Sequence, residues 1–271
     1  MLKKLSLIAI SISMILTLAG CGAPSARELQ LKTTAEQIQT AVQTELDKLD
    51  LDLANAAAEL SRTGLSGTEA KNILNGLTAK YPFIIDNCTT DNAGKMVTVA
   101  PDAYRDYEGT DISQQAVTIQ FNETKKPLLS QMFTAVEGMD AVVIMWPVFS
   151  DKGEFIGSVS ALFQPATLLS GASEPILKGT EMALDVMQMD GLDVYDSQGN
   201  DTGVNLFTDP ATQQYTELIA LGHQMVATES GTGSYTNISH TTGQMVKKQA
   251  YWATVKLHDT AWRLMCSTVV E

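Results

Sequence analysis

Two tyrosines, an arginine and an aspartate lie close together in one short polar segment, PDAYRDYEGTDIS, residues 101–113. The rings of Tyr104 and Tyr107 offer flat faces with hydroxyl groups, and the guanidinium of Arg105 can hold a carboxylate through paired hydrogen bonds. The carboxylate of Asp111 can hold an amine. We therefore expect this segment to contribute to a site for a small organic ligand, such as a carboxylate, an amino acid-like compound or an aromatic metabolite.

Both charged residues of this segment also have a structural interpretation. Asp111 precedes Gln114 by three positions, which is the spacing of a helix N-cap and its partner. Arg105 lies next to Asp106, and the two can form a solvated surface pair that binds nothing else. The sequence leaves both interpretations of Arg105 and Asp111 open.

A further candidate is Trp146, which precedes Pro147 in the apolar run AVVIMWPVF, residues 141–149. Alternate residues of a strand face opposite sides, and both faces of this run are apolar, which predicts a central strand covered on both sides. Pro147 has no N–H to donate to a neighbouring strand, so it predicts a bulge or an edge. Trp146 either lines a cavity beside that interruption or fills the core, and a buried indole N–H needs an acceptor.

The sequence lacks the usual arrangements of catalytic or metal-binding residues. Its histidines, His223, His240 and His258, are far apart and form no H-E-x-x-H pattern. It contains no G-x-S-x-G elbow, and the acidic turn at residues 195–202 lacks the closing glutamate of a calcium loop. We therefore predict neither an enzyme nor a metal or cofactor site.

The overall charge argues against nucleic acid as a partner. The 271 residues include 31 acidic and 18 basic ones, which gives a formal net charge of −13. Binding to a phosphate backbone requires clustered Lys and Arg that release counterions, and the sequence has no basic stripe. With 44% hydrophobic residues, the chain has a globular composition and room for one large domain or two of about 100 residues each.

The first twenty-one residues are typical of an export signal, with a positive MLKK start, an apolar stretch at residues 5–20 and small residues before Cys21. LTLAGC resembles the lipobox of prokaryotic lipoproteins, in which the cysteine is acylated and becomes the new N-terminus. This resemblance implies a signal peptide at residues 1–20 and a lipid anchor at Cys21, because two acyl chains hold a protein stably on a membrane. A membrane-spanning helix, the alternative, would need about 20 apolar residues.

Two cysteines remain after the signal peptide is removed, Cys88 and Cys266. They can pair in an oxidising compartment. However, they fall in different halves of the chain, and we favour two separate buried thiols that pack as small apolar side chains.

A long helix is predicted from residue 26 to residue 62. A helix of about 37 residues is about 55 Å long, so it must either form a coiled coil or run along more than one domain. Gly64 ends it, and a capping box at residues 66–69 begins a second helix that extends to about residue 80. Apolar residues recur every three or four positions on one face of the long helix, namely Ile38, Val42, Leu46, Leu49, Leu53, Ala57 and Leu60.

The rest of the chain repeats one pattern of strands and helical segments. Turn signals that combine Asp, Asn or Gln with Gly occur between apolar runs at residues 89–96, 149–156 and 195–202, and they predict β-hairpins. Each half therefore contains a strand, a hairpin, a helical crossover and another hairpin. The segment LLSGASEPILKG, residues 168–179, predicts a linker or a connecting helix between the halves.

Five segments, in this order, resemble the double Cache extracytoplasmic sensor domain, whose modules have a PAS-like fold. They are YEGTDIS (107–113), TKKPLLSQMF (124–133), VVIMWPVFSDKGEFIGSVSALF (142–163), MDGLDVYDSQGNDTGVNLFTDP (189–210) and TAWRLMCS (260–267). The resemblance implies an α+β fold in which a long N-terminal helix precedes two PAS-like Cache modules, each an antiparallel sheet with helical crossovers.

The same resemblance implies a division of the chain. Small-ligand cavities in such modules usually lie beneath the crossover, so the membrane-distal module is expected to bind a ligand and the membrane-proximal one to support it. The divisions are a signal peptide at 1–20, a tether at 21–33, the spine helix with the second helix at 34–80, the membrane-distal module at 81–170 and the membrane-proximal module at 171–271.

The chain departs from the best-known amino-acid-binding pattern of this family. That pattern has an Arg-x-Trp-Tyr cluster in the crossover and an acidic residue near the end of the last strand of the distal module. Here the crossover reads YRDYEG, and Leu162 stands where the aspartate is expected. Amino-acid recognition of the usual kind is therefore not implied, whereas an uncharged, carboxylate or aromatic ligand remains open.

Together these features predict a lipid-anchored protein on the extracytoplasmic face of the cell membrane that binds a small organic ligand. The chain ends at Glu271 without a second membrane span or a kinase segment, so it would present its ligand state to a membrane receptor or transporter. The alternative is a structural or protein-interaction lipoprotein whose cavity is filled by its own side chains.

Overall fold

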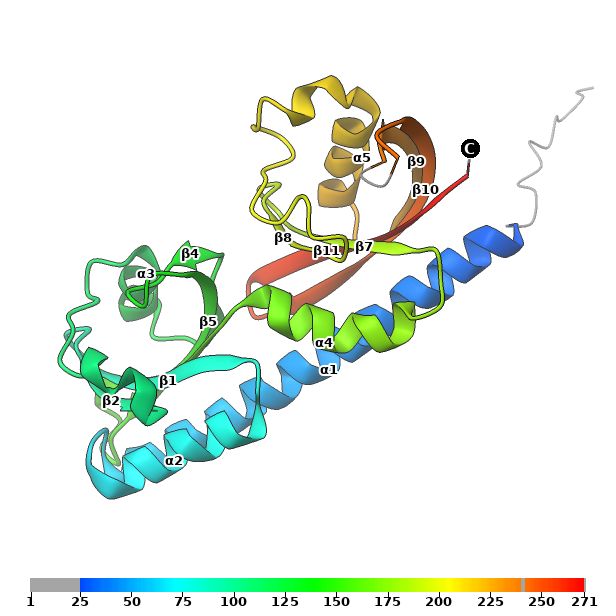
Figure 1. The fold of residues 1–271 in the computed structure, drawn as a ribbon. Coiled ribbons are helices and arrows are strands. Elements are labelled where there is room, and N and C mark those ends of the chain that lie inside the picture. The colour runs from blue at the N-terminus through cyan, green and yellow to red at the C-terminus, as the bar shows by residue number, and fades with distance from the viewer. Residues whose placement is uncertain (1–24, 240–241, 271) are drawn as a thin grey trace, which may run out of the picture.

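The computed structural model describes residues 25–239 and 242–270. The signal peptide at 1–20, the lipidation site Cys21 and His240 lie outside the described residues. The architecture is α+β, with two antiparallel sheet modules on the same side of one long helix, α1 (Figure 1). The predicted fold class is therefore confirmed.

Helix α1 spans Ala26–Thr63, 38 residues. Ser25 and Glu28 form a capping box at its start, in which the Ser25 hydroxyl accepts from the Glu28 N–H at 3.2 Å and the Glu28 carboxylate accepts from the Ser25 N–H at 2.7 Å. Gly64, with φ of 86°, ends the helix as expected. Because α1 begins at Ala26, most of the stretch 21–33 that we assigned to a tether is helical.

The second helix, α2, spans Gly67–Lys80 and packs beside α1 (Figure 1). Its N-cap is Ser66, but the Ser66 side chain makes no cap hydrogen bond. The position of this helix was thus predicted correctly, whereas the capping box predicted at residues 66–69 does not form. The helix buries Ala70, Leu74 and Leu77 against the core.

The first module is a six-stranded antiparallel sheet in the order β2-β1-β6-β5-β3, with β4 also paired to β5. A short 3-10 helix, η1 (Asp102–Tyr107), and helix α3 (Ala116–Thr124) form its crossover. The strands are β1 (Ile84–Asp91), β2 (Met96–Ala100), β3 (Leu128–Leu129), β4 (Phe133–Thr134), β5 (Asp140–Phe149) and β6 (Phe155–Phe163). The first two predicted turns, at 89–96 and 149–156, are hairpin turns in this sheet.

The second module follows helix α4 (Pro165–Leu177), the connecting helix expected between the halves. Its sheet order, β8-β7-β11-β10-β9, reproduces the order of the first sheet. The 3-10 helix η2 (Thr212–Gln214) and helix α5 (Thr216–Ala227) form the crossover. The strands are β7 (Ala183–Gln188), β8 (Asp193–Asp196), β9 (Gly231–Ile238), β10 (Met245–Leu257) and β11 (Thr260–Val269).

The third predicted turn, at residues 195–202, does reverse the chain, but the described residues that follow it, 203–211, form no second strand. Strand β8 ends at Asp196 and the hairpin that joins it to β7 turns at residues 189–192. The Asp196 carboxylate explains the difference, because it accepts hydrogen bonds from the N–H groups of Gln198, Asn200 and Asp201 at 2.7, 2.8 and 3.2 Å. These bonds close the turn. The returning chain then bonds to β8 at Asp193, which exchanges main-chain hydrogen bonds with Gly203 and Val204 at 2.8 and 2.9 Å.

Pro147 lies where the sheet is interrupted, as its missing N–H predicts. On one side of β5, Pro147 is in register with Ser158 of β6. On the other side, β3 pairs only with Met145 and Ile144, so at Pro147 this side of β5 is an edge of the sheet. The register also shifts between Val148 and Phe149.

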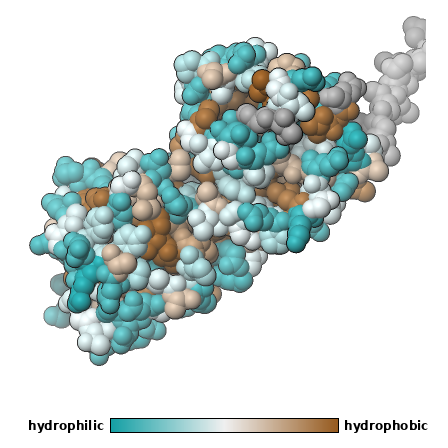
Figure 2. Space-filling model, viewed as in Figure 1, coloured by the Kyte–Doolittle hydropathy of each residue, from teal (hydrophilic) through white to brown (hydrophobic). Residues whose placement is uncertain are grey.

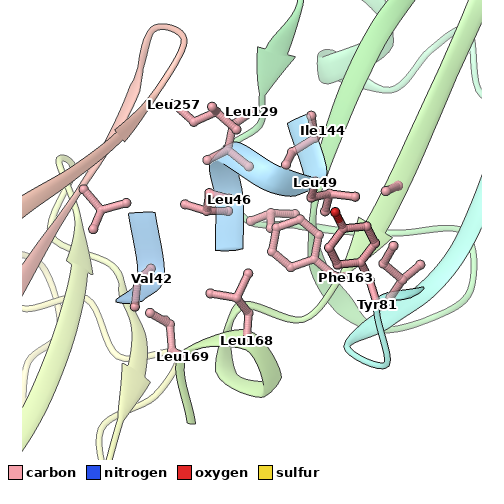
Figure 3. Close-up of a cluster of buried hydrophobic side chains, with 14 of the residues drawn as sticks. Val42, Leu46, Leu49, Tyr81, Leu129, Ile144, Phe163, Leu168, Leu169 and Leu257 are labelled. Carbon is pink, nitrogen blue, oxygen red and sulfur yellow. The ribbon is translucent and has the colours of Figure 1, made fainter. Parts of the chain in front are cut away.

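The two modules and α1 share one hydrophobic core. Figure 3 shows Leu46 and Leu49 of α1 between the first module, represented by Ile144 and Phe163, and Leu257 of the second module. Leu46 has no exposed surface. The apolar face of α1 predicted from its spacing is buried along its length, at Leu31, Ile38, Val42, Leu46, Leu49, Leu53, Ala57 and Leu60. The long helix therefore runs along two domains, which is one of the two solutions that its length allowed.

The outer surface is mainly polar. On the face seen in Figure 2, hydrophilic side chains cover most of both modules and hydrophobic ones form separate small patches. The exposed large hydrophobic residues are distributed along the chain, at Leu29, Leu51, Ile119, Val136, Phe149, Met245 and Val269. Scattered apolar residues of this kind are normal on a monomeric surface.

Because Leu46 contacts the shared core, Leu46→Ala should lower the free energy of unfolding by about 3 kcal/mol, the usual cost of a buried leucine that leaves a cavity. Urea denaturation followed by circular dichroism would measure the loss. Leu51→Ala, on the same helix but 62% exposed, is the matched control and should change stability by less than about 0.5 kcal/mol. Equal effects of the two substitutions would contradict a common core organised around α1.

Candidate functional site

The predicted crossover residues form a small cluster on the first module. Tyr104 and Tyr107 are partly buried, with ring centroids 6.3 Å apart, and they pack on Cys88, Met96 and Val99 of β1 and β2. The structure therefore brings the two tyrosines together, as expected from their spacing. Their rings cover the outer side of the sheet, opposite to the side that contacts α1.

The two charges of the crossover lie at the surface. Arg105 is exposed on η1. Asp111 is also exposed, and its carboxylate accepts a hydrogen bond from the Ser113 N–H at 2.9 Å, which lowers the pKa of Asp111. It therefore stabilises a local turn and does not cap α3, whose N-cap is Gln115.

Trp146 lies on the other face of the sheet from the crossover. Strand alternation turns it toward α1, where its Nε1–H donates to Asp50 Oδ1 at 2.7 Å. His258, in the turn between β10 and β11, places its Nε2 atom 2.8 Å from the same oxygen and packs edge-on against the Trp146 ring at 6.0 Å. Trp146 thus joins the helix and both modules, and it lines neither cavity described below.

A small cavity, about 40 Å³, lies in the first module. It lies between β1, β5, β6 and the crossover, and a volume of this size holds one or two water molecules. Asp86 lies at its floor, directly across from Leu162 in the pairing of β1 with β6. Leu162 stands where the family pattern has an acidic residue, and the neighbouring strand β1 places the Asp86 carboxylate beside it.

Asp86 is 2% exposed, and its Oδ2 atom has no hydrogen-bond partner among the described residues. Burial, reinforced by the neighbouring Glu137 carboxylate, raises the pKa of Asp86 to about 8. None of Tyr104, Arg105, Tyr107, Asp111 and Trp146 lines this cavity, although Cys88 and Met96, on which the two tyrosines pack, do.

A much larger cavity, about 340 Å³, lies in the second module. It is bounded by the outer face of the sheet, by α5 and by the segment 197–215. Figure 1 shows how this segment connects β8 to α5. This volume is within the range of small-molecule sites. Apolar side chains line much of it, namely Met187, Val204, Leu206, Leu218, Met225 and Met265.

Charged residues are concentrated at one side of this cavity. Asp185 of β7 and Asp193 of β8 line it on adjacent strands, with Asp196 directly across from Asp185. Burial and the neighbouring carboxylates raise the pKa of Asp185 to about 7, and the pKa of Asp193 is raised well above its usual value by the same causes. Lys248 lies on β10, 8% exposed, with its ammonium 5.8 Å from the centre of the Tyr235 ring.

Sequence reasoning missed the importance of this cavity, although a signal was present. Asp185 interrupts the otherwise apolar start of MALDVM, residues 182–187, and alternation places it on the same face as Met187. A carboxylate on a buried strand face requires a partner or a neighbouring cavity. Among the described residues, no group of three or more His, Cys, Asp or Glu is placed to hold a metal ion.

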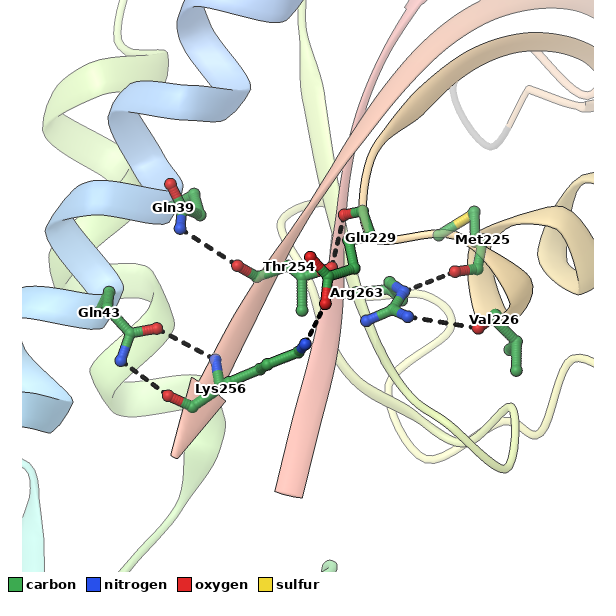
Figure 4. Close-up of polar contacts among 8 residues, drawn as sticks. All are labelled: Gln39, Gln43, Met225, Val226, Glu229, Thr254, Lys256 and Arg263. Carbon is green, nitrogen blue, oxygen red and sulfur yellow. Dashed lines mark hydrogen bonds and ion pairs between the residues drawn. The ribbon is translucent and has the colours of Figure 1, made fainter. Parts of the chain in front are cut away.

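The cavity is linked to α1 by hydrogen bonds across the second sheet (Figure 4). Arg263 of β11, 4% exposed, donates to the main-chain oxygens of Met225 and Val226 in the last turn of α5. On the opposite side, Gln43 of α1 exchanges two hydrogen bonds with the main chain of Lys256 on β10, at 2.7 and 3.0 Å. Met225 lines the cavity. Helix α5 is therefore bonded to β11, and α1 is bonded to β10, the strand paired with β11.

The two modules also contact each other directly. Thr260 of β11 donates to the Leu129 main-chain oxygen at 2.5 Å, and the Met132 N–H donates to Gln188 Oε1 at 2.6 Å. The two cysteines play no part in this contact. Cys88 and Cys266 are both free and buried, one in each module, as favoured from the sequence.

Residues 44–165 match the sequence profile of the family described as the HK/GC/chemotaxis protein-like sensor domain. A solved structure of an extracellular ligand binding receptor from Desulfohalobium retbaense is 31% identical, with a TM-score of 0.75. The match covers 89% of this chain and 40% of the receptor chain, so this chain spans well under half of that protein's length. No curated protein sequence matches the chain.

Two chemoreceptor domains of low identity share the fold. The ligand-binding domain of the Pseudomonas aeruginosa amino acid chemoreceptor PctB, solved with L-Arg, is 16% identical with a TM-score of 0.64, over 90% of this chain and 95% of that one. The domain of the Pseudomonas fluorescens chemoreceptor CtaA, solved with L-leucine, is 15% identical with a TM-score of 0.63, over 90% and 96%. The resemblance to Cache-type extracellular sensor domains, stated from the sequence, is thus confirmed by the profile match and by the fold.

In the part of the chain that the structure describes, no helix is both long and apolar enough to cross a membrane.

The raised pKa of Asp86 makes stability depend on pH. Between about pH 4 and pH 8 the unfolded chain ionises this carboxyl while the folded chain keeps it protonated, so rising pH destabilises the fold. Asp86→Asn should remove this dependence. As the pH rises from 5 to 8, the free energy of unfolding of the variant should increase relative to that of the wild type by on the order of 2 kcal/mol. Urea unfolding at both values measures it, with the exposed Asp106→Asn as control. Parallel pH profiles of the wild type and Asp86→Asn would contradict the prediction.

Proposed function

We propose that this protein is a lipid-anchored extracytoplasmic sensor that binds a small organic ligand in the second module and presents its ligand state to a membrane partner. The observation that carries the proposal is the cavity of about 340 Å³ beneath α5 and the segment 197–215. It combines an apolar lining with a few buried charges, which is the usual composition of a small-molecule site.

This proposal moves the main binding site from the module in which we expected it. The cavity of the first module, about 40 Å³, is too small for a metabolite unless the crossover moves. We retain a secondary site there, in which Tyr104 and Tyr107 border a widened cavity and the exposed Arg105 and Asp111 meet the ligand from outside. Trp146 would then act through its bond to Asp50 rather than through contact with the ligand.

The comparisons support a small organic ligand. The PctB and CtaA domains were solved with L-Arg and L-leucine, compounds of a size that such a fold accommodates. The receptor with 31% identity is described as an extracellular ligand binding receptor. By analogy we propose binding of a small metabolite here, without transferring the identity of any ligand.

Ligand binding would reach α1 through the second sheet. A ligand that repositions α5 displaces the main-chain oxygens that Arg263 holds, and therefore strand β11. Strand β10 is paired to β11 along residues 248–257 and is bonded to Gln39 and Gln43 of α1. This continuous set of contacts is a physical route for coupling, and a shift of α1 relative to the membrane is the signal that a partner would detect.

Membrane attachment would come from acylation of Cys21. The formal charge of −13 favours standing away from anionic lipid, so the anchor rather than the protein surface would hold the chain at the membrane. The alternative function, a structural or interaction lipoprotein, requires that no ligand occupies the second-module cavity.

Thermal-shift screening of residues 25–271 against a panel of amino acids, amines, organic acids and aromatic metabolites tests ligand binding. We expect at least one saturable stabiliser, since a ligand at 100 times its Kd adds about 2.7 kcal/mol to the folded state. Leu218→Trp, which fills the cavity from α5, should abolish that stabilisation. Glu217→Trp, an exposed neighbour on the same helix, should not. A panel without any stabiliser would favour the structural alternative.

Lipid anchoring is tested separately in the full chain expressed in a bacterium. Cys21→Ser should move the protein from the membrane fraction to the soluble fraction and prevent incorporation of labelled fatty acid, because the thiol that carries the acyl chain is gone. Cys88→Ser changes a buried thiol and should leave both properties intact. Membrane association that survives Cys21→Ser would contradict the anchor.

A further inference from the structure

The carboxylates of the second-module cavity outnumber its basic groups. Five of the lining residues are aspartates and one is a lysine. Helix α5 contributes no charged residue to the lining. The charged groups that face the cavity are Asp185 from β7, Asp193 and Asp196 from β8, Asp201 and Asp209 from the following segment, and Lys248 from β10. An anionic ligand would meet repulsion at most of these positions, and a cation would meet attraction.

Some of these aspartates are engaged by the loop that carries them. Asp196 accepts three main-chain N–H groups of its own turn, and Asp209 accepts the Ala211 N–H at 2.8 Å. Their carboxylates have a structural role that would exist without any ligand.

Asp185 and Asp193 differ from those two. Asp185 accepts no hydrogen bond from any described residue, and Asp193 uses only Oδ1, to accept the Tyr195 N–H at 2.9 Å. They belong to neighbouring strands, with Asp193 in register with Met187, two residues along β7 from Asp185. Both residues are half-buried, and a carboxylate oxygen that is partly withdrawn from water without a donor is costly. The raised pKa values of both groups express that cost. A cation placed between them would restore the missing donors.

A second observation, on the same face of the sheet but at its other edge, also points to a ligand. Asn237 of β9 lines the cavity and is 7% exposed, yet its Oδ1 atom has no hydrogen-bond partner among the described residues. A native fold rarely leaves a buried side-chain amide unpaired unless water or a ligand completes it. The cavity thus has unsatisfied polar groups at both sides and an apolar centre.

The position of Lys248 sets the orientation of a bound cation. Strand β11 lies between β7 and β10, so the strand that carries Lys248 is about 10 Å from the strand that carries Asp185. The Lys248 ammonium lies over the Tyr235 ring, on the β9 and β10 side. A positively charged ligand group would therefore bind at the β7 and β8 side, away from Lys248. The rest of the ligand would lie along Met187 and Met265, whose flexible side chains adapt to varied apolar shapes.

We propose that this cavity binds a small organic amine, with its protonated nitrogen between Asp185 and Asp193 and an apolar body against the methionines. The proposal rests on the proposed function and specifies the class of ligand. A primary ammonium group suits the site because it supplies three donors, and both Asp185 oxygens and Asp193 Oδ2 accept no hydrogen bond from the described residues.

Calorimetry with matched compounds tests the proposal. The probes are 2-phenylethylamine, 2-phenylethanol and 3-phenylpropionate, and the corresponding hexylamine, hexanol and heptanoate. We expect each amine to bind at least about tenfold more tightly than the alcohol of the same body, as charge-assisted hydrogen bonds allow. The carboxylates should not bind. Amines that bind no better than alcohols or carboxylates would overturn the proposal.

Substitutions of single aspartates test which carboxylates hold the ammonium group. Asp185→Asn and Asp193→Asn keep the side-chain shape, and each should weaken amine binding at least about tenfold. Asp190→Asn makes the same charge change in the turn before β8, outside the cavity, and should leave the affinity within about twofold. Wild-type affinity in a folded Asp185→Asn variant would contradict the proposal.

The pH dependence gives a further readout. Raising the pH from 6 to 8 ionises Asp185, whose pKa is about 7, while the amine stays protonated. Amine affinity should therefore rise over this interval in the wild type and change less in Asp185→Asn. Circular dichroism and the melting temperature of each variant verify that it is folded. A pH-independent affinity in the wild type would count against Asp185 as the partner of the amine.

The two levels of the proposal fail in different ways. If a neutral or anionic metabolite binds and Leu218→Trp removes that binding, the sensor function stands and the amine proposal is wrong. If no compound of any class binds, both are wrong.

Discussion

The structure depends on the burial of one helix face by two sheets at once. Leu46, Leu49 and their neighbours on α1 belong to one hydrophobic core with residues of both modules. Hydrophobic burial of this kind is non-directional. The orientation of the modules is therefore fixed by more specific contacts, which are the Gln39 and Gln43 bonds to β10 and the bonds of Asp50. Core and polar contacts together make one unit from two modules.

Much of the fold could be predicted from sequence because its signals are local. The three- and four-residue spacing of the long helix, the Gly-containing turns and the apolar strand with Pro147 each depend on neighbouring residues only. The third turn differs for a reason that is also local but more specific, since the Asp196 side chain binds main-chain N–H groups of the turn and the returning chain forms an isolated bridge instead of a strand. Turn residues alone do not distinguish these two arrangements.

The site was harder to predict than the fold, because a cavity is a property of packing between distant segments. Trp146 shows the difficulty: its alternation with Ile144 was read correctly, but the sequence did not reveal that this face meets α1 rather than the crossover. Asp185 shows the opposite case. Its polarity stands out in an apolar strand, yet its importance depends on residues 197–215, which leave space above it.

The two modules have the same strand order but different interiors. In the first, the crossover packs closely and leaves room for about a water molecule or two, whereas in the second, a longer connection and α5 leave space for a metabolite. The same framework therefore supports a compact module and a hollow one. Since both rest on α1, the compact module supplies a rigid reference against which movement in the hollow one can be transmitted.

Asp50 places a geometric condition on that movement. The Trp146 Nε1–H and the His258 imidazole meet at one oxygen atom of its side chain, one from each module. If the second module tilts about α1, the angle between the Trp146 and His258 hydrogen bonds at Asp50 Oδ1 changes. The tilts of the two modules are therefore not independent, because a displacement of either module changes a bond at an oxygen atom that the other module also uses.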